Sequence, residues 1–90
     1  MSAGFYTLAA WHVRAGQEHE FLRIWREELA PAFLSFNPSA QGTLIQSLND
    51  PQEFYSFGPW DSLAQMQAAR SDPGAQAALA KLVALCDRTR

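Results

Sequence analysis

The sequence predicts an α+β fold with a small, mostly antiparallel sheet, and three observations support this prediction. First, three segments either alternate apolar with polar residues or are rich in aromatic and β-branched residues, as strands are. Second, apolar residues recur every three or four positions in the remaining segments, which is the helical period. Third, the order is strand, helix, strand, strand, helix, helix, which matches a split βαββαβ unit without its last strand. The 90 residues are expected to form one domain over residues 1–90.

Residues 5–13, FYTLAAWHV, are predicted to form the first strand, because they are rich in aromatic and β-branched residues and contain no Gly or Pro. Side chains alternate between the two faces of a strand. One face would carry Phe5, Thr7, Ala9, Trp11 and Val13, and the other Tyr6, Leu8, Ala10 and His12. Both sets are largely apolar, so both faces of the sheet are expected to be covered.

Residues 17–36 are predicted to form the first helix. The apolar positions that recur at spacings of three and four are Leu22, Trp25, Leu29, Ala32, Phe33 and Phe36. Pro31 lies inside this pattern, lacks a backbone donor and clashes with the preceding turn, so we expect a kink or a break near Leu29. Asn37–Pro38 should end the element.

Residues 42–48 and 53–60 are predicted to form a hairpin. The first segment alternates Leu44, Gln46 and Leu48 with Thr43, Ile45 and Ser47, and the second, EFYSFGPW, is rich in aromatic residues. Between them NDPQ is a turn sequence, because Pro51 presets φ beside two Asx residues. One pair of the first strand, either Leu44 and Leu48 or Thr43 and Ile45, must be buried against something.

Two helices are predicted to follow the hairpin. Ser62 and Gln65 form a capping-box pattern at the start of a helix over residues 62–70. Asp72 followed by Pro73 starts the second helix, with a cap residue and then Pro at the first helical position. The buried stripe of this last helix is expected to be Leu79, Leu82, Val83 and Cys86.

The sheet is expected to be covered from outside the chain. Only four residues follow Cys86, so we expect no fourth strand, or a very short one. The first strand would then be an edge that a partner chain or the C-terminal tail must cover. The sheet face without helices of its own is not polar, which predicts a homodimer through the sheet face.

Composition and charge argue against several classes of function. The formal net charge is −2 and the seven Lys and Arg residues are scattered, which argues against binding to nucleic acid or to anionic membranes. No apolar run approaches the roughly 20 residues of a membrane span. The N-terminus lacks the pattern of a signal peptide, and the lone cysteine, Cys86, fits a cytoplasmic location. Its thiol is expected to be buried and inert.

Four features together resemble the antibiotic biosynthesis monooxygenase family over about residues 5–87. They are the glycine turn VRAGQEHEF, Trp25 on the first helix, the hairpin segment NDPQEFYSFG and the sequence W-D-S that opens the second helix. The resemblance implies a ferredoxin-like protomer and a dimeric α+β barrel, with a cavity between each sheet and its own helices. Some members of the family oxidise aromatic phenols without metal or flavin, and others degrade haem.

The resemblance also bears on individual residues. The Trp that lines the cavity in those two groups corresponds to Trp60. Haem-degrading members have an Asn where this chain has Ala9 and an iron-binding His where it has Arg70, so neither haem degradation nor a cofactor is expected. No metal site is expected either, because His12 and His19 are not at a ligand spacing and lack a third ligand.

The candidate catalytic residues are His12, Tyr55, Trp60 and Arg70, and the candidate ligand-binding residues are Trp25, Phe33, Phe57 and Trp60. His12 could act as a general base, and Arg70 could hold an anionic substrate or a developing phenolate. Structural alternatives exist for each of them. His12 could have a structural role in hydrogen bonding, and Arg70 could interact with the dipole of its helix. Trp60 could fill the core, and Tyr55 could pair with a side chain across the sheet.

Two functions are consistent with these patterns. The first is a cofactor-independent monooxygenase that acts on a small aromatic or quinone-type molecule. The second is a non-catalytic dimeric module that binds a small molecule or serves in assembly. A cavity of roughly 300 Å³ or more with a few convergent polar groups would favour the enzyme.

Overall fold

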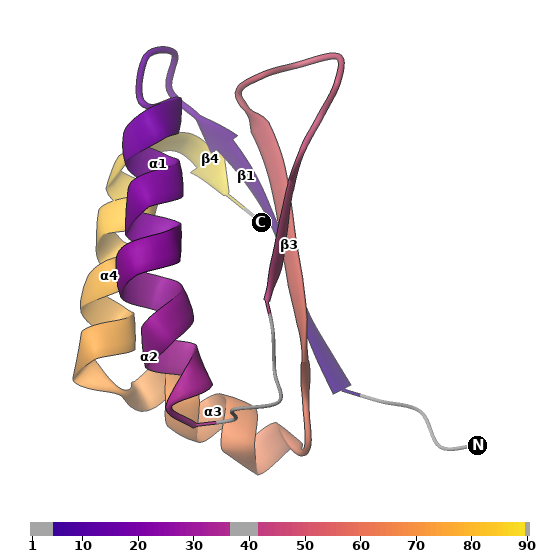
Figure 1. Cartoon of the computed structure of the whole chain (residues 1–90), viewed down its shortest axis with the longest axis vertical. Helices are drawn as coiled ribbons and strands as arrows, with labels where there is room; N and C mark the ends of the chain where they lie inside the picture. The colour runs from indigo at the N-terminus through magenta and orange to yellow at the C-terminus, as the bar shows by residue number, and fades with distance from the viewer. Residues whose placement is uncertain (1–4, 37–41, 90) are drawn as a thin grey trace.

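The computed structural model describes residues 5–36 and 42–89, which form a four-stranded antiparallel sheet with helices on one face (Figure 1). The strands are β1 (Phe5–Val13), β2 (Thr43–Gln46), β3 (Glu53–Trp60) and β4 (Cys86–Thr89). Their order across the sheet is β2-β3-β1-β4. The predicted α+β, ferredoxin-like class is therefore confirmed.

The fourth strand is the very short one that the sequence left open as an alternative to none. β4 pairs antiparallel with β1, with Thr89 opposite Trp11 and Arg88 opposite His12. β1 is consequently an inner strand between β3 and β4, so the C-terminal tail covers its edge, which was one of the two covers expected from the sequence. Cys86 also lies on β4 rather than on the last helix. β4 has only four residues, three of them exposed, so it carries no apolar alternation that the sequence could reveal.

The first helical stretch consists of α1 (Glu18–Ile24), a π-helical segment η1 (Trp25–Leu29) and α2 (Ala30–Leu34). The irregularity expected near Leu29 is present as this π-helical segment. The N–H of Ala30 donates to the carbonyl of Trp25, five residues back. Pro31 has no N–H to continue the α-helical pattern, and the wider turn before it accommodates that loss. The predicted end at Asn37–Pro38 lies outside the described residues.

The last two helices, α3 (Leu63–Ser71) and α4 (Pro73–Ala84), start at the predicted caps. The Ser62 hydroxyl accepts from the Gln65 N–H at 3.1 Å, and the Asp72 carboxylate accepts from the Ala75 N–H at 3.0 Å. These bonds satisfy backbone donors that a helix start would otherwise leave free. Figure 1 shows α4 beside the first helical stretch and α3 across one end of the sheet. Within the described residues, no helix combines the length and apolarity that spanning a bilayer requires.

The core lies between the helices and one face of the sheet. Its largest members are Trp11, Val13, Phe21, Ile24, Leu29, Phe54 and Leu82. The Phe21 ring packs between those of Trp11 and Phe54, with centroid distances of 5.5 Å and 5.1 Å. Such edge-on and tilted ring pairs add to the burial of their apolar area. This packing fills the space beneath the Val13 end of β1 and leaves the other end of the layer less filled.

The opposite face of the sheet has no helix over it within the described residues (Figure 1). Tyr6, Leu8, Ile45 and Phe57 are all exposed there, and Leu8 is 73% exposed. These residues share the face because they alternate with the core-facing residues of β1, β2 and β3. We call this surface the open face. Of the two pairs considered on β2, Leu44 packs against the core, whereas Ile45 belongs to the open face.

Candidate functional site

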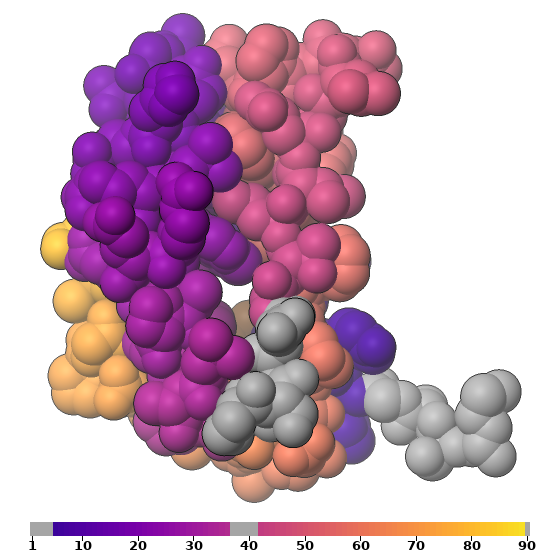
Figure 2. Space-filling model, in the orientation of Figure 1, coloured from indigo at the N-terminus to yellow at the C-terminus, as the bar shows by residue number. Residues whose placement is uncertain are grey.

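A cavity of about 340 Å³ lies between the sheet and the helices, at the end of β3 away from the hairpin turn. Figure 2 shows the molecule hollowed between the first helical stretch and the β2–β3 hairpin. The lining residues come from β1, η1, α2, β3, α3 and α4, so most elements of the fold contribute to one site. The volume falls near the lower end of the roughly 300–1,000 Å³ of ligand pockets, which suits a compact molecule.

Aromatic rings form two walls of this cavity. Trp60, the last residue of β3, lines the sheet side and is buried. Phe33 on α2 meets it edge-on, with ring centroids 5.3 Å apart and an interplanar angle of 81°. Trp25 on η1 lines the helix side. A flat, apolar ligand would therefore find ring faces and edges around it, which are the contacts that aromatic molecules favour.

Two hydroxyl groups lie on the sheet side of the cavity, and each accepts a hydrogen bond from an indole. Trp11 Nε1 donates to Ser56 Oγ at 2.9 Å, and Trp60 Nε1 donates to Thr7 Oγ1 at 3.3 Å. Ser56 is only 5% exposed. These bonds satisfy both indole donors, and each hydroxyl retains its own O–H proton. The polar character of the cavity thus consists mainly of hydroxyl donors.

Arg70, in the last turn of α3, is the one charged residue among the described residues that line the cavity. Its side chain is exposed and makes no hydrogen bond or ion pair with another described residue. An arginine carries its positive charge at every relevant pH and can donate two parallel hydrogen bonds to a carboxylate or phenolate. The cavity therefore has one cationic group at an accessible position.

The structure brings together five of the residues proposed from the sequence: Trp25, Phe33, Phe57, Trp60 and Arg70 all line the cavity. Phe57 borders it from the open-face side of β3, as its alternation with the buried Ser56 dictates.

The expectation that His12 and Tyr55 share the same wall is wrong. Both belong to the open face, because His12 pairs with Glu53 across β1 and β3, and Tyr55 is two residues further along β3. Neither lines the cavity.

Ser56 and Thr7 were missed as site residues. Their signal was present in the alternation of the strands, since Ser56 is the polar residue between buried Phe54 and Gly58 on the cavity face. A buried hydroxyl on an otherwise apolar strand face requires a partner, and here that partner is an indole N–H. Leu79 and Val83 of α4 also line the cavity, so Val83 is half-exposed at its margin and is not part of a closed core stripe.

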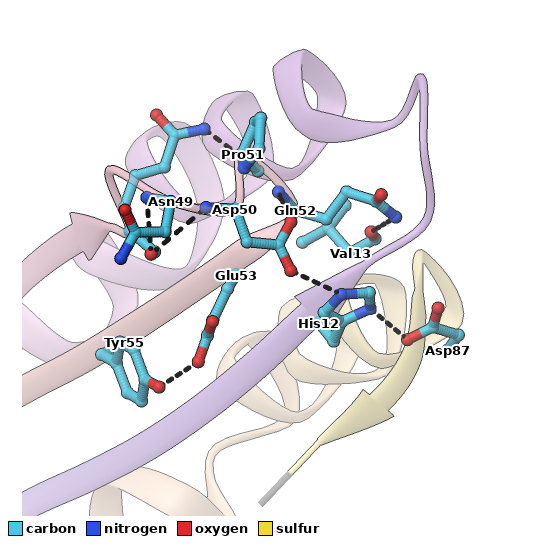
Figure 3. A network of polar contacts seen from close by, with 11 residues as sticks. His12, Val13, Asn49, Asp50, Pro51, Gln52, Glu53, Tyr55 and Asp87 are labelled. Atoms are coloured by element: carbon cyan, nitrogen blue, oxygen red, sulfur yellow. Dashed lines mark hydrogen bonds and ion pairs between the residues drawn. The ribbon is translucent and has the colours of Figure 1, made fainter.

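His12 instead connects three elements on the other side of the sheet (Figure 3). Its Nδ1 lies 2.7 Å from an Asp87 oxygen on β4, and its Nε2 lies 3.1 Å from an Asp50 oxygen in the β2–β3 turn. The bond to Asp87 raises the pKa of the His12 imidazole above its ordinary value, and the bond to Asp50 adds to that effect. This geometry favours the structural interpretation of His12, as a histidine that ties β1, β4 and the hairpin turn together.

A second, shallower hollow of about 400 Å³ lies beside His12 on the open face, lined by Ala10, Trp11, His12, Glu53, Arg88 and Thr89. Tyr55 donates a hydrogen bond to the Glu53 carboxylate next to it (Figure 3). Acid, base and phenol groups therefore gather here, whereas the cavity under the helices contains rings and hydroxyls. The two hollows lie on opposite faces of the sheet and are chemically different.

No set of three His, Cys, Asp or Glu side chains within the described residues is arranged to hold a metal ion. Cys86 is buried, and desolvation raises the pKa of its thiol to about 11. A thiol with so high a pKa is almost entirely protonated near neutral pH and is a poor nucleophile. The residues available for chemistry in the cavity are therefore its rings, its hydroxyls and Arg70.

Comparison of the sequence with models of protein families identifies the family of this chain. The model of the antibiotic biosynthesis monooxygenase family matches residues 4–81. The chain belongs to this family. A sequence search of curated proteins finds no match, so relatives with this fold come from solved structures.

Several solved structures share the fold of this antibiotic biosynthesis monooxygenase family member. A Bordetella bronchiseptica protein that carries the family's name aligns with a TM-score of 0.83 and 16% identity, over 99% of this chain and 92% of that chain. A mutant of SnoaB, a cofactor-independent oxygenase from Streptomyces nogalater, aligns with a TM-score of 0.82 and 18% identity, over 99% and 88%. A NIPSNAP family protein from Agrobacterium tumefaciens aligns with a TM-score of 0.75 and 17% identity, over 98% of this chain and 88% of that chain. At these identities the likeness shows the fold alone.

Proposed function

We propose that this family member is a cofactor-independent oxygenase that binds a small aromatic or quinone-type molecule in the cavity between its sheet and its helices. The observation that carries the proposal is the cavity itself. Trp25, Phe33 and Trp60 surround about 340 Å³ of open space with hydroxyls in its wall, rather than interlocking to fill it. SnoaB, which shares the fold, is a cofactor-independent oxygenase. That likeness supports the proposed reaction class without identifying a substrate.

The proposed reaction needs no external reductant, because the substrate supplies all the electrons. Loss of a proton from an activated CH₂ group to solvent water leaves a carbanion, which forms a C–O bond with O₂. A proton from water completes the hydroperoxide, and elimination of water leaves a carbonyl. A CH₂ group and O₂ thus become a C=O group and H₂O, so one oxygen atom is retained and the other leaves as water. The protein would contribute binding, orientation and charge stabilisation.

The described residues can be assigned roles within this proposal. The rings of Trp25, Phe33 and Trp60 would hold the aromatic body of the substrate. The hydroxyls of Ser56 and Thr7 would donate to its oxygen atoms, since each already accepts from an indole. Arg70 would stabilise negative charge on the substrate.

Oxygen consumption tests the proposal. The purified protein would be mixed with anthrones, which carry the activated CH₂ group, in buffer with a chelator and without flavin, and O₂ uptake and product would be measured. We expect one O₂ per carbonyl formed with at least one compound, and a large loss of rate in Trp60→Leu. The variant His12→Gln is the matched control, because His12 lies on the opposite face of the sheet. A normal rate in Trp60→Leu would contradict the assigned site.

A second candidate function is supported by one observation. The described residues that line the cavity include no carboxylate and no imidazole, so the protein itself offers no general base there. That composition suits a module that binds a small molecule without transforming it. Tight, Trp60-dependent binding of an aromatic compound with no O₂ uptake under any condition would favour this alternative.

We also propose that the chain forms a homodimer through the open face. Members of the family are typically dimeric, and Tyr6, Leu8, Ile45 and Phe57 expose apolar surface together on this face. Leu8→Arg should convert the dimer to monomer in size-exclusion chromatography with light scattering. Leu48→Arg is the matched control, because Leu48 is fully exposed in the hairpin turn rather than on the sheet face. An unchanged mass for Leu8→Arg would exclude this interface.

A further inference from the structure

The polar side chains that line the cavity, Ser56, Thr7 and Arg70, can each donate a hydrogen bond to a ligand. The Ser56 and Thr7 hydroxyls each use one lone pair on an indole N–H and keep a proton to donate. Arg70 has donors only. No carboxylate or imidazole lines the cavity within the described residues. A ligand with oxygen acceptors would therefore find donors at these positions, but no described lining carboxylate or imidazole that could take its proton.

Charge leads to the same conclusion. Arg70 makes no ion pair with another described residue, although the chain as a whole has a net charge of −2. Arg23 is paired with Glu20 and Glu27, and Lys81 is paired with Glu28. Arg26 and Arg88 also lack an ion pair with a described residue, but only Arg70 lines this cavity. An arginine beside an apolar cavity attracts an anion more strongly than one in open water, because the effective dielectric constant is lower there. The cavity thus offers an unmatched positive charge.

We propose that the cavity selects aromatic molecules that arrive already ionised, as phenolates or aromatic carboxylates, with the anionic oxygen at Arg70 and a further oxygen at Ser56 or Thr7. The inference rests on the proposed function, because it names the substrate class of that same cavity. It differs from the alternative, considered from the sequence, that His12 could act as a general base on the substrate. The acidity needed for reaction would be a property of the substrate, and the protein would stabilise the anion once it is bound.

A matched pair of ligands tests the substrate class. 4-Nitrophenol ionises near neutral pH and its phenolate absorbs visible light, whereas 4-nitroanisole has the same ring with a methylated oxygen that cannot ionise. We expect 4-nitrophenol to bind about tenfold or more tightly than 4-nitroanisole at a pH where it is ionised, the range of one charge-assisted hydrogen bond. Bound 4-nitrophenol should titrate at a lower pH than the free compound, read directly from its absorbance.

Variants of Arg70 test whether this side chain causes the preference for 4-nitrophenol and the shift in its titration. Arg70→Gln should abolish most of the preference for 4-nitrophenol and most of the shift in its titration, while the affinity for 4-nitroanisole stays within about twofold. Arg70→Lys should retain part of both, because it keeps the charge but not the paired donors. Arg26→Gln is the matched control, since Arg26 is an exposed arginine that does not line the cavity. Val83→Trp, at the margin of the cavity, should weaken both ligands by occupying the space.

The outcomes separate this inference from the proposed function. In one outcome, 4-nitrophenol and 4-nitroanisole bind with equal affinity, Arg70→Gln changes neither affinity, and Val83→Trp lowers both. The cavity is then the ligand site, but the proposed anionic substrate class is wrong. If neither ligand responds to Val83→Trp or Trp60→Leu, the cavity is not the site and both proposals fall. A titration of bound 4-nitrophenol that shifts to higher pH would also overturn the inference, because the cavity would then favour the neutral phenol.

Discussion

The two faces of the sheet differ in what covers them and in the chemistry they hold. The helix-covered face is formed by alternate residues such as Trp11, Phe54 and Trp60, and it contains a packed core that opens into an apolar cavity. The open face is formed by the intervening residues, and it combines exposed apolar side chains with a polar cluster around His12. Residues adjacent in sequence therefore belong to different environments.

This difference shows why composition alone was a poor guide to the site. The aromatic residues of EFYSFGPW divide between both faces: Phe54 and Trp60 point to the core side, whereas Tyr55 and Phe57 belong to the open face. Of these four, Trp60 lines the cavity from the core side and Phe57 borders it from the open-face side, whereas Phe54 packs into the core. Tyr55 and Phe57 present apolar area to whatever lies beyond the sheet. An aromatic-rich strand thus supplies an interior and an exterior surface at once.

The largest expected effect contrasts two phenylalanines on β3. Phe54 is 1% exposed and packs against Phe21, so Phe54→Ala should lower the free energy of unfolding by about 3–5 kcal/mol. Phe57 is 37% exposed on the open face, so Phe57→Ala should cost much less at low protein concentration. Urea unfolding at two protein concentrations would measure both.

The dependence of unfolding on protein concentration should differ between Phe54→Ala and Phe57→Ala. If the open face is buried in a dimer, the cost of Phe57→Ala should grow as the protein concentration rises, because dimerisation stabilises the folded state by mass action. The cost of Phe54→Ala should depend far less on concentration. Equal costs for the two substitutions in the dilute, monomeric protein would contradict the assignment of faces.

An intermediate effect is expected at Ser56. Ser56→Ala leaves the buried Trp11 N–H without its acceptor, which should cost about 1–3 kcal/mol. The additional substitution Trp11→Phe removes the unpaired donor, so the two changes together should cost less than the sum of their separate effects. Ser71→Ala, at an exposed serine in α3, should change stability within about 0.5 kcal/mol. Strict additivity in thermal or urea unfolding would exclude an energetic role for this hydrogen bond.

The smallest effect is expected from the His12 cluster on the open face. The folded-state pKa of His12 is raised above 6.5, so its bonds to Asp87 and Asp50 contribute fully below that value. The contribution should be lost as pH rises through the folded-state pKa. Hydrogen bonding from the Gln52 N–H, and then from His12, lowers the pKa of Asp50, so its own contribution is lost only in more acidic solution.

Unfolding midpoints at pH 5.5 and 8.5 would measure this effect. At pH 5.5 the unfolding midpoint of the wild type should be higher than that of His12→Gln. The difference between the two midpoints should be smaller at pH 8.5. The charged residues that face His12 from the neighbouring strands are Glu53 on β3 and Arg88 on β4. His19→Gln, at an exposed histidine of α1, is the matched control. A gap that widens with pH would mean that His12 acts as a neutral hydrogen-bonding group.

Much of the fold could be predicted because its signals are local. The hairpin, the Ser62 and Asp72 caps and the irregularity before Pro31 depend on residues within one turn of each other. β4 could be expected only as a very short strand or none, because four mostly exposed residues form a strand only through their pairing with β1. One cavity is lined by four of the residues proposed from the sequence, namely Trp25, Phe33, Trp60 and Arg70. Their roles in binding or catalysis stay predictions.

The separation of His12 from the cavity was accessible in principle. The strand alternation already divided His12 from Trp11, but the register between β1 and β3 decides which residues of β3 join each set. Register depends on pairing across more than 40 residues of chain, which no local pattern specifies. Ser56 was missed for the same reason, since its importance arises from a tryptophan on the neighbouring strand.

The π-helical segment η1 has a consequence for how insertions and deletions act on this fold. A π-helical turn has the effect of one extra residue in an α-helix, and each residue rotates a helix by about 100°. Trp25 at the start of η1 and Phe33 on α2 both line the cavity across that extra residue. Deleting exposed Glu27 would remove that extra residue and favour a regular helix, in which the two rings, then seven residues or about two turns apart, stay on one face. A single-codon deletion inside η1 could thus leave both walls of the site in place.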